Sequence, residues 1–142
     1  ESIDQELVVR SAQVHALMPM MQFSVAPWRI LSDENNDICR RMAELHVAMG
    51  EEIVRLARQS AETGEPIVRS MEYQYPHQGY AGIRDQFLLG PDILVAPVVE
   101  KGARSRTVQI PEGKWLGDDG SVVTGPCRII GFSPRTVNMP VR

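Results

Sequence analysis

Residues 85–98 read DQFLLGPDILVAPV, and this stretch decides the fold of the second half of the chain. Residues 93–99 at its end are apolar throughout, apart from Pro97. A short apolar run beside turn-forming residues is typical of a strand that is buried on both faces. We therefore predict the central strand of a sheet at this position.

The sequence on both sides of this stretch has the alternation of short strands. Downstream, residues 106–110 alternate between two faces, with Val108 and Ile110 on the same face as Arg106. Upstream, the large residues Met71, Tyr73 and Tyr75 alternate with polar ones, which predicts a strand with one wet face. Turn-forming residues separate the strands at 101–102, 111–113, 117–120 and 133–134. Short strands with this spacing predict a small antiparallel sandwich.

Residues 1–65 have helical periodicity instead. One helix is predicted over residues 4–17, with a capping box of Ser2 and Gln5 at its start and Pro19 after its end. Its predicted apolar stripe consists of Leu7, Val8, Val14 and Leu17. Residues 18–23 are then predicted to form a short buried strand, because this apolar run is too short for a new helix.

A second, long helix is predicted from Asn36 or Asp37 to Thr63, where Gly64 and Pro66 stop it. Its apolar residues step by three or four and form one stripe: Ile38, Met42, Leu45, Met49, Ile53 and Leu56. The opposite face is charged, and Glu51 and Arg55 have the i,i+4 spacing of an ion pair.

These elements do not make a self-contained first domain. The single predicted strand has no neighbour, although parallel βα units need neighbouring strands with which to pair. A complete (β/α)8 barrel takes about 250 residues, and the chain has 142. It starts with Glu1, as a mature or excised segment of a longer polypeptide would. We therefore expect that further strands precede this segment.

Composition argues against several classes of protein. A formal charge of -3, from 15 Lys and Arg against 18 Asp and Glu, is unlike the clustered basic surface of a nucleic-acid binder. Hydrophobic residues make up 43% and charged residues 23%, as in ordinary globular domains. No apolar run approaches the roughly 20 residues that cross a bilayer, and residues 1–5 are too polar for a signal peptide.

No motif indicates a metal or a cofactor. Cys39 and Cys127 lie far apart and match no metal-ligand or redox spacing. His15 and His46 lie on the predicted helices without a Cys or His partner three or four residues away. His77 lies in a loop of aromatic and polar residues, where either a carbohydrate contact or a plain turn would explain it.

Five short motifs resemble those of glycoside hydrolase family 31 and follow one another in the same order as in that family. They are ELVVR at 6–10 with Gln13 and Pro19, PW at 27–28, TGEPIVR at 63–69, the stretch 85–98, and GAR at 102–104 with PEGKW at 111–115. Each motif alone is weak, but their order over about residues 6–115 makes chance agreement improbable. The resemblance fades from Leu116 onward.

This resemblance implies a retaining α-glycosidase, in which a (β/α)8 barrel is followed by a β-sandwich. Residues 1–65 would be an α/β barrel remnant, namely the helix, strand and long helix that end the catalytic barrel. Residues 66–142 would be the proximal C-terminal domain, an all-β antiparallel sandwich. The full-length parent would hydrolyse O-glycosidic bonds of α-linked sugars, so its partner would be a carbohydrate substrate.

Retaining hydrolysis requires two carboxyl groups about 5–5.5 Å apart. In the family both are Asp residues on earlier barrel strands, so the resemblance implies no catalytic residue in this segment and no activity of the segment alone. The carboxylates that are present do not replace them. Glu51 and Glu52 are neighbours on a helix, where their side chains point about 100° apart, and Asp118 and Asp119 lie in a turn.

One segment is expected to lie near substrate. In the family, the loop after the eighth barrel strand reads Arg, any residue, His, and the His binds sugar hydroxyls. Alignment on Pro19 puts Gln22 and Ser24 at those two positions, with Phe23 between them. Because the His is absent, we expect a sugar unlike glucose, a bridging water, or a loop residue without a ligand at Ser24. Trp28 would either stack on a sugar or close the loop, and these four residues are the candidate substrate-binding residues.

Two other functions fit the sequence less well. A non-catalytic carbohydrate-binding β-sandwich module needs a row of exposed aromatic residues, and several of those after residue 65 alternate inward. Its oligosaccharide binding would be lost on Trp115→Ala. A protein-interaction domain is the other alternative. The barrel remnant, in contrast, predicts that both helical stripes stay partly uncovered and that the isolated segment self-associates.

Overall fold

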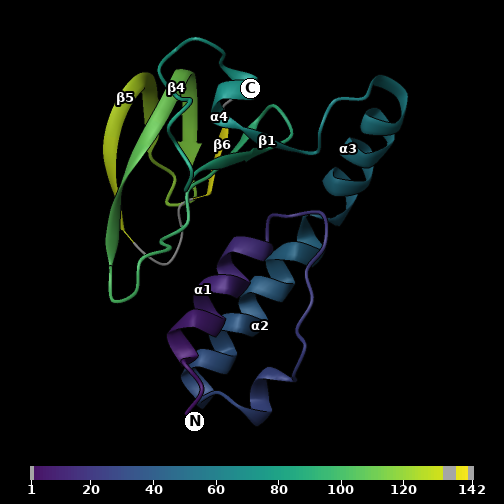
Figure 1. Cartoon of the computed structure of the whole chain (residues 1–142), viewed down its shortest axis with the longest axis vertical. Coiled ribbons are helices and arrows are strands. Elements are labelled where there is room, and N and C mark those ends of the chain that lie inside the picture. Colours follow the sequence, from purple (N-terminus) through teal and green to yellow (C-terminus); the bar gives the residue numbers. More distant parts are fainter. Residues whose placement is uncertain (1, 133–136, 141–142) are drawn as a thin grey trace. The chain divides into compact units, whose positions relative to one another are not determined.

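The computed structural model describes residues 2–132 and 137–140 of the chain. The chain divides into two compact units, Glu1–Ile67 and Val68–Arg142. Figure 1 shows helices α1, α2 and α3 in the first unit and antiparallel strands in the second. The predicted order of a helical part followed by antiparallel strands is therefore confirmed.

Helix α1 spans Gln5–His15. Asp4 caps its N-terminus, since the Asp4 side chain accepts a hydrogen bond from the Leu7 amide at 3.2 Å. The predicted capping box is wrong, because this carboxylate lies next to the unpaired amides of the first turn. The Gln5 side chain bonds elsewhere instead. Its Oε1 accepts from the Ser32 amide at 2.9 Å and from Asn35 Nδ2 at 2.8 Å.

The predicted long helix is two helices. A short 3-10 turn, η1 (Pro27–Arg29), precedes α2 (Asp33–Ala48), which Ser32 caps by accepting from the Asn35 amide at 3.3 Å. Helix α3 (Gly50–Thr63) follows a break at Met49, where φ is -86° and ψ is 0°. Glycine is a poor helix former, which explains a break beside Gly50. Gly64 ends α3 with φ of 79°, as predicted.

The first unit buries one side of α1 against α2, which lie side by side in Figure 1. The predicted stripe of α2 and α3 is confirmed, since all six of its residues are buried or half-buried. The stripe of α1 is partly wrong. Leu7 is 66% exposed, and the residues packed on Cys39 and Met42 are Val9, Ala12 and Ala16. On the outer face, Arg55 pairs with Glu52 rather than with Glu51.

The second unit has six strands in the antiparallel order β1-β2-β3-β6-β4-β5. Their bounds are β1 Val68–Ser70, β2 Phe87–Leu89, β3 Ile93–Val95, β4 Ser105–Gly117, β5 Val122–Phe132 and β6 Val137–Pro140. Strand β6 pairs with both β3 and β4, and so joins the first three strands to the β4–β5 ribbon. Leu88 and Leu94 from one part pack with Val108, Ile110 and Trp115 from the other. The predicted central strand is confirmed as β3, although it is shorter.

Two local predictions in this unit are wrong. The predicted strand around Met71–Tyr75 is instead the one-turn helix α4 (Met71–Gln74), because Ser70 Oγ accepts from the Tyr73 amide at 3.1 Å and caps it. The predicted turn at 111–113 is a register shift inside β4, where a bulge lets the strand continue. Turns do occur at 101–102 and 118–119. The predicted turn at 133–134 lies outside the described residues.

Candidate functional site

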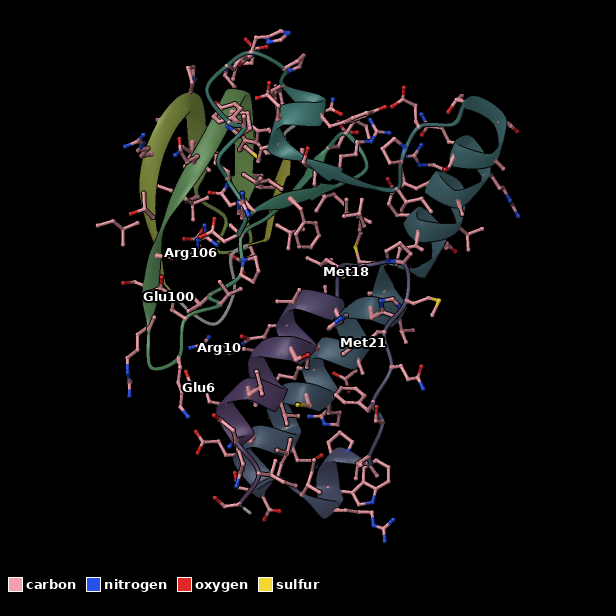
Figure 2. All side chains as sticks on the ribbon, in the orientation of Figure 1. Glu6, Arg10, Met18, Met21, Glu100 and Arg106 are labelled. Atoms are coloured by element: carbon pink, nitrogen blue, oxygen red, sulfur yellow. The ribbon has the colours of Figure 1, made fainter. Side chains whose placement is uncertain are left out.

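The candidate site is the segment between α1 and η1, where residues 18–23 were predicted to form a strand. No strand pairing is present there. Figure 2 shows Met18 and Met21 in this segment, just after the end of α1. The predicted short strand is therefore not formed in this chain, because the described residues offer no neighbouring strand with which it could pair.

Exposure alternates along the segment in the way it does along a strand. Met20, Gln22 and Ser24 are exposed, while Met21 and Phe23 are half-buried against the α1–α2 core. Side chains that alternate with a period of two belong to opposite faces of an extended chain. One face therefore packs on the helices, and the other carries a thioether, an amide and a hydroxyl.

The backbone of residues 20–25 makes no hydrogen bond with any described part of the chain. Backbone N–H and C=O groups inside a folded protein are almost always paired, either with protein or with ordered water. A segment with one packed face and two open edges is thus able to accept a strand on each side. The sequence prediction missed Met20, which shares the open face with Gln22 and Ser24 and could have been found by the same two-residue step.

Trp28 lies next to this segment on η1. Its side chain is 73% exposed, while the preceding Pro27 is buried. An exposed indole on a short proline-started helix is available to a sugar ring or to another protein surface. In the described chain it does not close the loop by packing into the core.

Two carboxylates of the described residues, those of Asp37 and Asp119, have local partners that lower their pKa values. Asp119 Oδ1 accepts from the Ser121 amide at 2.9 Å, and hydrogen bonds with the side chain and the amide of Ser121 lower the pKa of Asp119. The pKa of Asp37 is also lowered, by hydrogen bonds to Arg40 and Arg41. A general acid needs a raised pKa, so these two groups are shifted in the wrong direction for that role.

The histidines likewise have structural partners. His15 Nδ1 lies 2.7 Å from the Ser11 carbonyl oxygen, and His46 Nδ1 lies 3.1 Å from that of Ala16. The amide of His77 donates to Glu72 Oε1 at 2.9 Å, in a loop where His77 has φ of 61°. Within the described ranges, no three His, Cys, Asp or Glu side chains gather where they could hold a metal ion.

The aromatic side chains that the structure describes in the strand unit do not form an open row. Trp115 is 3% exposed and donates its Nε1 to the Pro111 carbonyl oxygen at 3.1 Å, and Tyr80 is 7% exposed. Tyr73 is 49% exposed. A buried tryptophan cannot act as a sugar-stacking platform, which weighs against the carbohydrate-binding module. None of the described helices has the length and apolar character needed to cross a bilayer.

Known proteins of one family resemble this chain. It is 39% identical over 121 residues to a myogenesis-regulating glycosidase from Mus musculus, covering 84% of this chain and 17% of that protein. It is 27% identical over 130 residues to a 1,3-alpha-isomaltosidase from Kribbella flavida, covering 80% of this chain and 18% of the relative. The chain thus spans less than a fifth of these relatives.

Solved structures give the same result. A family 31 dextranase from Flavobacterium johnsoniae, complexed with glucose, has a TM-score of 0.87 at 30% identity, covering 96% of this chain and 18% of that one. A family 31 alpha-xylosidase from a soil metagenome, complexed with xylose, has a TM-score of 0.85 at 28% identity, covering 96% and 25%. Residues 64–141 match the glycosyl hydrolase family 31 C-terminal domain, and the chain therefore belongs to glycosyl hydrolase family 31.

Proposed function

We propose that this chain is the C-terminal segment of a retaining α-glycosidase that hydrolyses O-glycosidic bonds of α-linked sugars. The names of its relatives support this class, since they include an isomaltosidase, an alpha-glucosidase and an alpha-xylosidase. These names differ in the sugar but agree on α-linked substrates. The carbohydrate substrate would be bound by the full-length parent.

The observation that carries the proposal is the unpaired segment at residues 20–25. It packs one face on helices and leaves its other face and both edges open. A strand of a (β/α)8 barrel has helices on its outer side, a neighbouring strand along each edge, and side chains on its inner side that fill the barrel or reach the active site. In this proposal, residues 1–65 are the end of the catalytic barrel, and residues 66–142 are the sandwich domain after it.

The same layout divides the four candidate substrate residues by role. Gln22 and Ser24 lie on the open face near the C-terminal end of the segment, which is the catalytic end in barrel enzymes. They would contact substrate directly, through one amide and one hydroxyl. Phe23, which packs against the helices, would hold the segment in place. Trp28 would offer its exposed ring to a more distant sugar.

The catalytic acids would lie on polypeptide before Glu1. Retaining hydrolysis uses a nucleophile and an acid/base on facing carboxyl groups, and the chain spans 17% and 18% of two glycosidase relatives. The segment alone would then be inactive, because neither half of the acid pair is present. Turnover of any aryl α-glycoside by the purified 142-residue chain would refute this part of the proposal.

The decisive experiment compares this chain with the longer polypeptide that contains it. The longer protein should hydrolyse aryl α-glycosides with retention of configuration, followed by NMR of the first-formed anomer. In that protein, Gln22→Ala and Ser24→Ala should each raise KM by several-fold. Gln78→Ala, at an exposed position in the other unit, is the matched control and should leave KM unchanged. Inverted product, or unchanged KM in both site variants, would contradict the assignment.

Self-association of the isolated segment belongs to the same proposal. Four large apolar side chains of the first unit are 66–79% exposed: Leu7, Met20, Trp28 and Val47. Apolar surface of this kind is normally covered in a stable protein. Light scattering on the isolated chain should show oligomers whose mass rises with concentration, and the Met20→Lys variant should reduce them. A monodisperse monomer at all concentrations would count against the barrel assignment.

A further inference from the structure

The side chain of Gln86 makes the two backbone hydrogen bonds that a neighbouring strand would otherwise make. Its Oε1 accepts from the Gln109 amide at 2.8 Å, and its Nε2 donates to the Gln109 carbonyl oxygen at 2.9 Å. The N–H and C=O of one residue in an antiparallel strand point to the same neighbour. Both groups of Gln109 are therefore taken by one side chain, which is only 4% exposed.

This contact covers a free stretch of strand edge. Strand β4 pairs with β5 on one side along most of its length, whereas the described residues of β6 pair with its other side at Trp115–Gly117. At Gln109 that second side has no strand partner among the described residues. An unpaired strand edge exposes backbone groups that are costly to leave unsatisfied and that invite pairing with other chains. The Gln86 amide satisfies both groups at this position.

Arg106 of β4 links this strand to both ends of the β2–β3 hairpin. Its Nη1 donates to the carbonyl oxygens of Asp85 at 2.5 Å and of Pro97 at 2.7 Å. These two residues lie just before β2 and just after β3, so one guanidinium joins the two ends of the β2–β3 hairpin. Asp85 Oδ2 also lies 3.0 Å from Arg106 Nη2, which adds an ion pair to this link. Arg106, whose side chain is 10% exposed, is labelled in Figure 2 on β4.

The two side chains also depend on each other. Arg106 Nη2 donates to Gln86 Oε1 at 3.4 Å, and a guanidinium has only donors to offer. It therefore favours the amide orientation in which Oε1 faces Arg106 and the Gln109 N–H, which leaves Nε2 to donate to the Gln109 carbonyl. In the reversed amide orientation, Nε2 would face two other donors, namely Arg106 Nη2 and the Gln109 N–H.

We propose that Gln86 and Arg106 form a latch, which holds the β2–β3 hairpin on the free edge of β4 and controls the local opening of the strand unit. Local openings of a folded protein start where few backbone bonds must break. The ladders of β1–β2, β2–β3 and β3–β6 and the packing of Leu88 and Leu94 also hold the hairpin, and the latch is its hydrogen-bonded link to the free edge of β4. Releasing the latch uncovers the edge at Gln109 and loosens the hairpin there.

Amide exchange measured by NMR on the 142-residue chain tests this proposal. In Gln86→Leu, the Gln109 amide should exchange at least tenfold faster than in the wild type, while Val108 and Ile110, whose groups face β5, should change by less than twofold. In Arg106→Lys, the amides of Leu88 and Leu94 should exchange several-fold faster, because a lysine ammonium cannot reach both hairpin ends in the geometry of a guanidinium. Gln78→Leu is the matched control, with no expected change.

The outcomes separate a latch from plain destabilisation. An unchanged Gln109 rate in Gln86→Leu, or an equal rise at Val108, Gln109 and Ile110, would overturn the proposal. If Gln86→Leu does not fold, Gln86→Glu decides the matter. Its carboxylate can still accept from the Gln109 amide and from Arg106 but cannot donate to the Gln109 carbonyl oxygen, so protection of the Gln109 amide should be reduced without being lost. Loss of that protection would overturn the latch.

Discussion

Replacing Gly125 with alanine is expected to break the β4–β5 ribbon at its bulge. A methyl group added at Gly125 would lie 1.8 Å from the Pro111 carbonyl oxygen, 2.7 Å from the Pro111 carbonyl carbon and 2.9 Å from the Ile110 carbonyl oxygen. An ordinary C···O contact is about 3.3–3.6 Å. The facing strand would therefore have to move by about 1.5 Å, and all three atoms belong to backbone that no side-chain rotation can displace.

The expected cost is set by two opposing effects. Overpacking usually costs about 1–3 kcal/mol, and a clash with backbone should reach or exceed the upper end. Alanine also restricts the unfolded chain, which returns roughly 0.4–1 kcal/mol. The net loss of stability should thus be about 2 kcal/mol or more. Gly82→Ala is the control, because its methyl group would have no atom within 4 Å, and it should be neutral or slightly stabilising.

Trp115 is the reporter for this experiment. Its Nε1 donates to the Pro111 carbonyl oxygen that the new methyl group would displace. Because Trp28 is 73% exposed, the measurement uses a Trp28→Phe background in which Trp115 gives the signal. Gly125→Ala should shift the native emission to longer wavelength and lower the urea midpoint, whereas Gly82→Ala should change neither. If Gly125→Ala matches Gly82→Ala in both emission and midpoint, the close approach of the two strands is refuted.

Three further outcomes are expected. Ser32→Ala should lower the free energy of unfolding, measured by thermal unfolding, by about 1 kcal/mol through loss of the α2 cap. Asn36→Ala, at one of the two helix starts predicted from the sequence, should lower it by less than about 0.5 kcal/mol. Equal losses would contradict the observed helix start. The pKa of Asp37 is lowered by two neighbouring arginines, so its carboxylate stabilises the fold only while ionised; Asp37→Asn should be less stable than the wild type above about pH 5, and this difference should shrink as the pH falls through the folded pKa. Burial raises the pKa of the Cys39 thiol, and this side chain is 1% exposed. Ellman's reagent should therefore label Cys127 in the folded chain and Cys39 only after denaturation. Equal labelling rates of the two thiols would argue against the buried position of Cys39.

Short-range patterns in the sequence predicted the elements whose formation depends on residues close together in the chain. Ile53 and Leu56 continue a helical step and are buried, because periodic apolar residues fix which face of a helix can pack. Gly64 ends α3 in the left-handed conformation that its missing side chain permits. The apolar run at 93–99 contains β3 in the middle of its sheet. Each of these depends on residues within a few positions of one another.

The errors arose where a nearby alternative competed with the pattern. The alternation around Tyr73 suits a strand, but Ser70 caps a helical turn at the same place. Asp4 displaced the predicted capping box at the start of α1 because it is two residues closer to the helix than Ser2. For the candidate site, the spacing of Gln22 and Ser24 was sufficient to put them on one face. Met20 follows by the same two-residue step, whereas the openness of this face became evident only from the packing of Met21 and Phe23 on the helices.

The sequence by itself determined the family, the helical first part, the position of the central strand and the expectation that the chemistry lies elsewhere. Only the tertiary structure decided that Gln86 hydrogen-bonds the backbone of Gln109, that Arg106 pairs with Asp85, and that residues 20–25 have no strand partner in the described part of the chain. The reason is the range of the forces involved. Periodicity and capping act within one or two turns of the chain, whereas these contacts join residues about 20 positions apart, and strand pairing depends on segments that are distant in the sequence.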